Sequence, residues 1–288
     1  MSVQHLHYPQ QDSRPAPRRF FLQRLLAGVG MTIGLSFSLG LGLTAGAAHA
    51  TPVAPVNGAE YRTLDKVQAT EAGKKIEVTE FFWYSCPHCN AFEPSLEEWV
   101  KKQGDNIIFR RVPVAFRDNF QPQQRLYYAL EALGKVDEMQ LKVFKAIHVD
   151  RKTLDSEAQI ADFVAANGVD RKKFLDVYNS FGVQTKLRRA AQLQEAYRID
   201  GVPLVAIDGR FMTSPSIVGT TLGSQPEPVL QSATLQVMDW LLNKASKERK
   251  AAAVTPAAGS TAVTASGTHP AAHATARPAG NVAVLVRK

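Results

Sequence analysis

Cys86 and Cys89 are the only cysteines in the 288 residues, and they stand in the tetrapeptide Cys-Pro-His-Cys. A framework of structural disulfides would need more cysteines, spread along the chain. A zinc site built on this pair would need two further ligands from elsewhere in the sequence. The pair therefore indicates a lone dithiol whose exchange partners are other molecules.

The residues on either side predict a strand before the pair and a helix after it. Residues 74–84 form an extended run rich in β-branched and aromatic side chains. Between residues 91 and 102 the apolar side chains recur at the spacing of one helix face; they are Phe92, Leu96, Trp99 and Val100. Pro87 suits the first helical turn, where its missing N–H has no partner to lose. Cys86 is thus expected at the N-terminus of a helix.

This position predicts an acidic thiol at Cys86. Free backbone N–H groups and the positive end of the helix dipole stabilise an anion there. They stabilise only the reduced state, because a disulfide carries no charge, and each unit of pKa depression is worth about 1.4 kcal/mol. His88 can add a hydrogen bond or a partial positive charge to the same sulfur. The oxidised protein is therefore expected to give its disulfide away readily.

The remaining elements follow in an order that we read as β–α–β, a helical stretch, and β–β–α. A second strand is predicted over Ile107–Val114, parallel to the first. A long helical stretch runs from Gln121 to Arg198, with helix caps predicted at residues 155–156 and 167–168. A short strand over Pro203–Asp208 leads through an Asp-Gly turn into the next strand, and a last helix is predicted over Pro228–Ala245.

Together these residues resemble the DsbA family of thiol–disulfide oxidases. The matching segments are Glu80-Phe81-Phe82, Cys86-Pro87-His88-Cys89, Phe92-Glu93 and Gly201-Val202-Pro203. The resemblance implies an α/β, thioredoxin-like fold with an inserted all-helical domain. Its parts would be residues 61–119 and 199–247 for the thioredoxin-like domain and residues 120–198 for the helical insertion.

The resemblance also implies a role for each residue of the site. Cys86 would form the mixed disulfide with a substrate thiol, and Cys89 would be its buried partner. Pro203 would be a cis-proline facing the pair, with the backbone of Val202 free to bind an extended substrate segment. The alternative for these two residues is an ordinary strand start.

Three acidic residues near the motif call for separate expectations. Glu80 is expected to be buried beneath the disulfide, where it helps to move the Cys89 proton; its alternative is a solvent-facing strand position. Glu77 is expected to face solvent. Glu93 is expected to be solvated at the surface, with an ion pair to Arg110 or Arg111 as the alternative.

The two ends of the chain differ from its middle in composition. Residues 1–50 combine four arginines, an apolar stretch and the terminal Ala48-His49-Ala50, which predicts a cleavable signal peptide, exported by the Sec or the twin-arginine route. An uncleaved membrane anchor is the alternative. Residues 51–60 would begin the mature protein. Residues 248–288 are of low complexity and are expected to be a disordered tail.

Charge argues against a nucleic-acid partner. Of the formal net charge of +8, residues 1–50 carry +3 and residues 247–288 carry +5, so residues 51–246 are formally neutral. A basic binding surface on the folded domain is therefore not expected. Metal binding by His88 with the two cysteines is also not expected, because His148, the only further histidine of the folded part, is predicted to lie far away.

The function predicted from these observations is a periplasmic enzyme that donates its Cys86–Cys89 disulfide to exported proteins as they fold. The family implies reoxidation by a membrane quinone-linked oxidase of the DsbB type, and no cofactor besides the cysteine pair. The protein is expected to be a monomer. The alternatives are a disulfide isomerase or reductase, and a metal-binding or peptide-binding protein on a thioredoxin-like scaffold.

Overall fold

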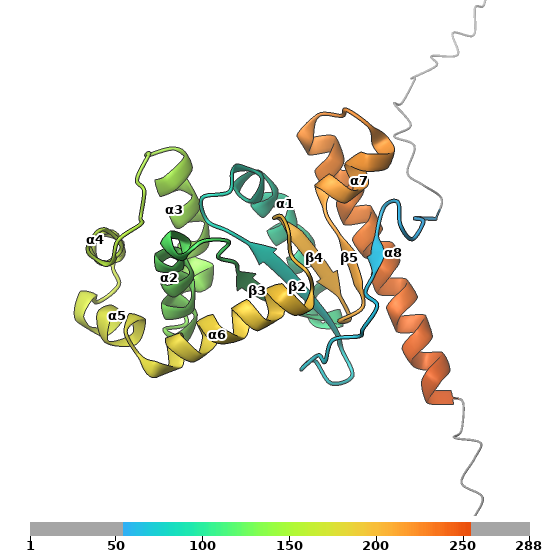
Figure 1. Cartoon of the computed structure of the whole chain (residues 1–288), viewed down its shortest axis with the longest axis horizontal. Helices are drawn as coiled ribbons and strands as arrows, with labels where there is room; N and C mark the ends of the chain where they lie inside the picture. The colour runs from blue at the N-terminus through green and yellow to red at the C-terminus, as the bar shows by residue number, and fades with distance from the viewer. Residues whose placement is uncertain (1–53, 255–288) are drawn as a thin grey trace, which may run out of the picture. The chain divides into compact units, whose positions relative to one another are not determined.

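The structure, a computed structural model, describes residues 54–254 (Figure 1). They form a mixed five-stranded sheet in the order β1-β5-β4-β2-β3, in which only β2 and β3 are parallel neighbours. The strands are β1 (Arg62–Thr63), β2 (Ile76–Phe82), β3 (Ile107–Pro113), β4 (Leu204–Ile207) and β5 (Phe211–Thr213). This sheet with helices confirms the predicted α/β class.

Strand β2 is the strand that carries the chain into the site. It lies between β3 and β4 and is buried at every residue. Phe81 and Phe82 are fully buried, and each contributes roughly 1.5–3 kcal/mol by leaving water. The chain then crosses to β3 through helix α1 (Pro87–Gln103) and a short 3₁₀ helix, Gly104–Asn106, as predicted for a parallel pair.

The expectation for Glu77 was wrong. Glu77 is only 7% exposed. Strand β2 is paired with another strand on each side, and the loop that precedes β2 folds over Glu77. The Glu77 carboxylate accepts the Glu71 N–H at 3.0 Å and lies 3.2 Å from Arg110 Nε. A buried carboxylate is tolerated in this strand because it has these partners.

The helical stretch predicted between Gln121 and Arg198 is present as five helices. They are α2 (Gln121–Ala132), α3 (Val136–His148), α4 (Glu157–Ala166), α5 (Arg171–Tyr178) and α6 (Phe181–Ala196), and the 3₁₀ helix Asp118–Phe120 precedes them. Ser156 caps α4 by accepting the Gln159 N–H, as predicted, and Asp170 and Ser180 cap the next two helices in the same way. Figure 1 shows α2–α5 gathered beside β3, away from α8.

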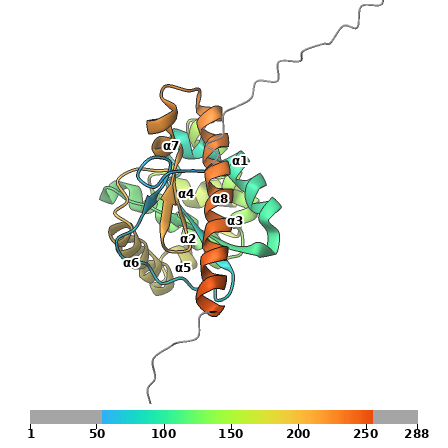
Figure 2. The ribbon, with the colours of Figure 1, turned by 90° about the vertical axis from the view of Figure 1, so that its right-hand side faces the viewer.

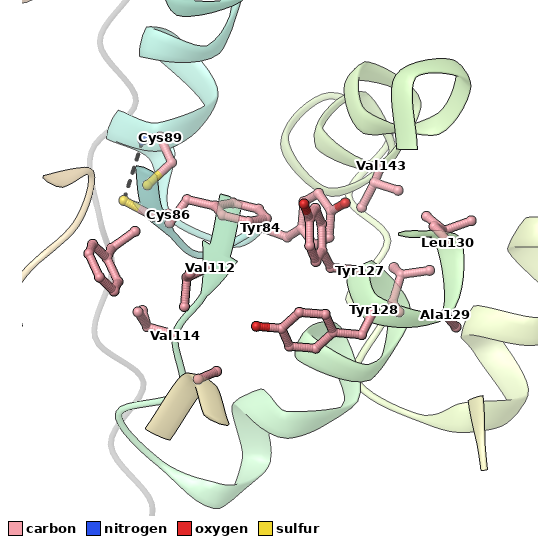
Figure 3. Packing of buried hydrophobic residues seen from close by; sticks show 14 of the residues in the cluster. Tyr84, Cys86, Cys89, Val112, Val114, Tyr127, Tyr128, Ala129, Leu130 and Val143 are labelled. Atoms are coloured by element: carbon pink, nitrogen blue, oxygen red, sulfur yellow. Dashed lines mark hydrogen bonds between the residues drawn. The ribbon is translucent and has the colours of Figure 1, made fainter. Parts of the chain in front are cut away.

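Two hydrophobic clusters hold these elements together. One joins the helical insertion to the sheet and includes Cys86 and Cys89. Figure 3 shows the two cysteines at one end of the drawn residues, with Tyr84 lying toward Tyr127 of α2. The other cluster lies where α1 and α8 (Glu227–Val254) pack on the sheet. The redox pair thus belongs to the cluster that the insertion completes.

The C-terminal boundary expected at Lys247 was wrong. Helix α8 continues to Val254, and Figure 2 shows it running along the sheet. Arg249 donates to the carbonyls of Gly73 and Lys75 at 3.0 Å each and also binds Asp208. Long-range partners therefore extend the helix into sequence whose composition predicts disorder. Helix α7 (Pro215–Leu222), capped by Ser214, was not anticipated either.

The predicted signal peptide, residues 1–50, lies outside the described residues, as do residues 255–288 of the predicted tail. Across residues 54–254, no helix has the length and apolar character needed to cross a membrane.

Candidate active site

Cys86 is the N-cap of α1, and Pro87 occupies the first turn, as predicted. The Cys89 N–H donates to Cys86 Sγ at 3.4 Å, which is the capping hydrogen bond of this helix. Cys86 is 7% exposed and Cys89 is fully buried. Both are free thiols in the structure. Only the Cys86 sulfur is therefore within reach of another molecule.

The environment gives the two thiols opposite acidities. The pKa of Cys86 is lowered to about 6, first by the hydrogen bond with the Cys89 side chain. The backbone N–H groups of Cys89 and His88 and the charge of His88 lower it further, and together they outweigh burial. Burial raises the pKa of Cys89 well above its ordinary value. A thiolate therefore forms at Cys86 while Cys89 keeps its proton.

The loop before β4 lies against the pair. The Val202–Pro203 peptide bond is cis, as the family resemblance implied. The carbonyl of Val202 accepts a hydrogen bond from Cys86 Sγ at 3.4 Å. Two residues 116 positions apart in the sequence therefore meet at the reactive sulfur.

A groove of about 550 Å³ runs beside these residues. Its apolar wall includes Val202, Leu204, Ile217 and Leu230, contributed by β4, α7, α8 and the loop before β4. His88 lies on its rim. A groove of this kind, next to a reactive sulfur, suits an extended peptide segment with apolar side chains.

A buried charge cluster lies behind the cysteines. Arg111 Nε is 3.0 Å from Glu80 Oε2, and Arg111 Nη2 is 2.5 Å from Glu93 Oε1. Burial, and then the charge of Glu93, raise the pKa of Glu80 to about 8. Glu80 acts on Cys89 in turn, since its charge is among the causes that raise the pKa of that thiol. One cation thus serves two carboxylates, and Glu80 is predominantly protonated at neutral pH.

The structure decides between the alternatives for the acidic residues. Glu80 is fully buried rather than solvent-facing. The expectation of a surface position for Glu93 was wrong, because the first turns of α1 press it against β3, where it is also fully buried. Of its two candidate partners, Arg111 binds it, whereas Arg110 pairs with Glu71 and Glu77.

The segment just before the nucleophile is held by the helical insertion. Tyr84 Oη donates to Gln140 Oε1 at 2.7 Å, and His148 Nε2 lies 2.8 Å from the Tyr84 carbonyl oxygen. Ser85 Oγ and the Gln123 side-chain amide hydrogen-bond at 2.7–3.0 Å. Gln140 continues to Glu93 at 3.3 Å, so this network reaches the charge cluster.

Sequence reasoning missed these contacts. His148 was expected to lie far from the motif, yet it binds the residue two positions before Cys86. The partners of Tyr84 lie 56 and 64 residues away along the chain. No spacing rule links residues so distant, and only an alignment of relatives could have signalled the pairing.

His88 contacts Glu227 in the first turn of α8, where Nδ1 and Oε1 are 2.8 Å apart. Within residues 54–254, no three or more histidine, cysteine, aspartate or glutamate side chains come together as a metal site.

Comparisons with known proteins point to the same chemistry. Residues 77–234 match the family model of the DSBA-like thioredoxin domain. A relative in Burkholderia cepacia, named thiol:disulfide interchange protein DsbA, is 45% identical over 212 residues, which are 73% of this chain and 95% of the relative. A relative of the same name in Pseudomonas aeruginosa strain PAO1 is 36% identical over 195 residues, 68% of this chain and 86% of the relative.

Solved structures agree in fold. The crystal structure of Pseudomonas aeruginosa DsbA matches with a TM-score of 0.62 at 34% identity, covering 69% of this chain and 97% of that one. The Xylella fastidiosa oxidoreductase DsbA matches with a TM-score of 0.58 at 29% identity, covering 68% and 98%. The acidic thiol at a helix start, the buried second cysteine and these matches agree, and the chain belongs to the DsbA family of thiol–disulfide oxidoreductases.

Proposed function

We propose that the protein works as an oxidase, which donates the Cys86–Cys89 disulfide to exported proteins as they fold. The observation that carries this proposal is the opposite acidity of the two thiols. Stabilising the Cys86 thiolate lowers the free energy of the reduced protein and leaves that of the disulfide unchanged. Reduction of the protein, which is oxidation of its client, is thereby favoured.

The exchange takes two steps. A client thiolate attacks Cys86 Sγ, the bond to Cys89 breaks, and Cys89 leaves as a thiolate that takes up a proton. A second client thiolate then attacks the client sulfur of the mixed disulfide, and Cys86 leaves as a thiolate. Two electrons pass from two client thiols to the cysteine pair, a client disulfide forms, and the second thiol proton is released to solvent.

Glu80 is the group that we assign to the Cys89 proton. Its pKa of about 8 keeps it protonated at neutral pH, so it holds a proton in the buried region where the Cys89 thiolate forms. Burial raises the pKa of Glu80 most, the charge of Glu93 raises it further, and Arg111 lowers it. Replacing Glu80 with glutamine should therefore change the pH dependence of client oxidation, measured as refolding rate between pH 5 and 9; an unchanged profile would contradict this role.

The remaining site residues bind the client. We assign client pairing to the backbone at Val202, where an extended client segment would add as a strand adds to a sheet edge; the support is that the Val202 carbonyl lies 3.4 Å from Cys86 Sγ. Pro203 supports that backbone opposite the cysteine pair. Pro87 starts α1 without leaving an N–H unsatisfied, which keeps Cys86 at the helix end.

The proposed setting is the periplasm, reached through the predicted signal peptide. The support is the naming of the relatives as DsbA and the composition of residues 1–50. A membrane quinone-linked oxidase of the DsbB type would restore the disulfide. The cysteine pair would be the only redox centre, and the protein would act as a monomer.

The test is oxidative refolding of reduced, unfolded ribonuclease by the purified oxidised protein, followed by a redox titration against glutathione. The wild type should restore ribonuclease activity. Cys86→Ala should abolish it, and Cys89→Ala should accumulate mixed disulfides at Cys86. A strongly reducing equilibrium would favour a reductase. Rescue only of ribonuclease with scrambled disulfides would favour an isomerase. An active Cys86→Ala variant would sink the proposal.

A further inference from the structure

An ion pair joins the beginnings of two distant helices beside the reactive sulfur. His88 lies in the first turn of α1 and Glu227 is the first residue of α8, 139 positions later. The side chains are 68% and 40% exposed. Figure 2 shows the upper end of α8 lying next to α1. Both residues also line the groove beside Pro203.

The position of Glu227 is set by the packing of α8. This helix is anchored in the core by side chains that are fully buried or nearly so, Val237, Met238 and Leu241. A carboxylate in the first turn of a helix is also favoured by the helix dipole. The core packing of α8 therefore fixes the position of Glu227 at the groove, where its carboxylate contacts the His88 ring.

The pair has a definite effect on charge. The hydrogen bond to Glu227 is the first cause that raises the pKa of His88. A carboxylate at Nδ1 also fixes which ring nitrogen carries the hydrogen in the neutral form. The charge of His88 in turn helps to lower the pKa of Cys86. Two other charged residues of opposite sign line the groove, Arg62 and Asp200.

We propose that Glu227 is a positioning residue that sets the oxidising strength of the enzyme, by orienting His88 and keeping it positively charged beside Cys86. The proposal rests on the function proposed above and adds a residue that lies far outside the Cys-Pro-His-Cys motif. Glu227 contacts His88, and it acts on Cys86 through that side chain. Through this contact, a residue of α8 influences the acidity of the Cys86 thiol at the start of α1.

The effect can be followed through the exchange with glutathione. Two glutathione thiols reduce the Cys86–Cys89 disulfide and leave as one glutathione disulfide, one proton stays on Cys89, and the other is released as Cys86 ionises. Without the carboxylate, His88 is neutral more often at pH 7, and the Cys86 thiolate loses stabilisation. A rise of about half a unit in the pKa of Cys86 would shift this equilibrium about three-fold toward the disulfide.

The competing effect has the opposite sign. The negative charge of Glu227 could act on Cys86 directly, and its removal would then lower the pKa of that thiol. The two effects separate in a double-mutant cycle that includes His88→Leu. An effect carried by His88 disappears in that background, whereas a direct effect of the carboxylate remains.

The experiment measures three quantities in five full-length proteins. The proteins are the wild type, Glu227→Gln, His88→Leu, the double variant, and Glu98→Gln, which changes an exposed carboxylate elsewhere on α1. The quantities are the His88 pKa by NMR, the Cys86 pKa by thiolate absorbance, and the equilibrium constant with glutathione. Circular dichroism establishes that each variant folds.

Glu227→Gln should lower the His88 pKa, raise the Cys86 pKa and shift the glutathione equilibrium about three-fold toward the disulfide. A sixth protein, Glu227→Asp, should restore part of each change, and Glu98→Gln should match the wild type. An unchanged or lowered Cys86 pKa in Glu227→Gln would overturn the proposal, as would the same shift in the His88→Leu background. A wild type that cannot oxidise ribonuclease would instead refute the proposed function, with the pKa cycle still readable.

Discussion

At the scale of single residues, Arg111 faces two fully buried carboxylates with one positive charge. Two carboxylates that share one cation in a buried site cannot both ionise easily. The pKa of Glu80 is raised to about 8 and that of Glu93 is also raised, in both cases mainly by burial. The free energy of unfolding should therefore depend on pH through the ionisation of this cluster.

Glu80→Gln is expected to stabilise the protein at alkaline pH. In the unfolded chain Glu80 ionises near its ordinary pKa of 4.5, but in the folded protein it does so near 8. The stability that neutral Glu80 provides is full below the first value and is lost as the pH rises through the second. The variant lacks this loss, so its advantage should be small at pH 4.5 and reach roughly 2–4 kcal/mol at pH 8. Denaturant unfolding of the reduced proteins measures it, and an advantage independent of pH would contradict the assignment.

At the scale of elements, the helical insertion completes the active site. Three side chains from α2 and α3 bind the two residues that precede the nucleophile; they are Gln123, Gln140 and His148. The strand-to-helix turn needs this support, because a backbone carbonyl buried without a partner is costly. The insertion thereby helps to fix the backbone of the turn that holds Cys86 as the N-cap of α1.

His148→Leu is expected to weaken this support. It leaves the Tyr84 carbonyl without its partner, which should cost about 1–2 kcal/mol of stability and slow alkylation of Cys86. His148→Gln keeps a side-chain N–H donor and should recover much of both. Urea unfolding and alkylation kinetics at pH 7 test the pair of variants. Equal behaviour of the two variants would show that the hydrogen bond does not hold the turn.

A second prediction at this scale concerns the end of α8. Arg249 reaches two backbone carbonyls near β2 and the buried Asp208. Arg249→Ala should therefore cost about 1–2 kcal/mol by leaving Asp208 with one cation, Arg210, instead of two. A chain ending at Lys247 should be destabilised by at least as much, whereas one ending at Val254 should keep the stability of the full chain. Thermal unfolding distinguishes these cases.

At the scale of the whole molecule, redox state and stability are coupled. The folded Cys86 has a pKa of about 6 against an ordinary value of 9. The stabilisation of the reduced protein is therefore full above pH 9 and is lost as the pH falls through about 6. Cys89 adds little between pH 5 and 8, because its thiol stays protonated both in the folded protein, where burial raises its pKa, and in the unfolded chain, where its pKa is the ordinary 9.

The reduced protein should therefore gain stability over the oxidised protein between pH 5 and pH 8. Denaturant unfolding of both redox forms across this range gives the difference directly. Repeating the series in Glu80→Gln removes the contribution of a second buried group, whose pKa is raised to about 8. A difference that does not change with pH would mean that the Cys86 thiolate is not specially stabilised.

Local patterns in the sequence account for most of the elements and for the centre of the site. The apolar spacing after the motif predicted α1, and Ser156 predicted a helix start, because both signals act within one or two helical turns. The same reasoning placed Cys86 at the N-terminus of a helix and therefore predicted a lowered pKa for its thiol. The family motif supplied the cis bond before Pro203, which spacing alone does not indicate.

Contacts between distant segments were decided only by the tertiary structure. Sequence reasoning placed the charged side chains of Glu93 and Glu77 at the surface. Neighbouring strands and loops bury both of them, and Arg111 pairs with Glu93 while Arg110 pairs with Glu77. His148 and Glu227 reach the site from helices whose placement depends on how the core packs. The sequence by itself determined the reactive pair and the helix that carries it, since hydrogen bonding and periodicity act locally. The ion pairs and supporting hydrogen bonds around that pair were decided by tertiary packing, because burial and ion pairing depend on which segments, distant in sequence, come into contact.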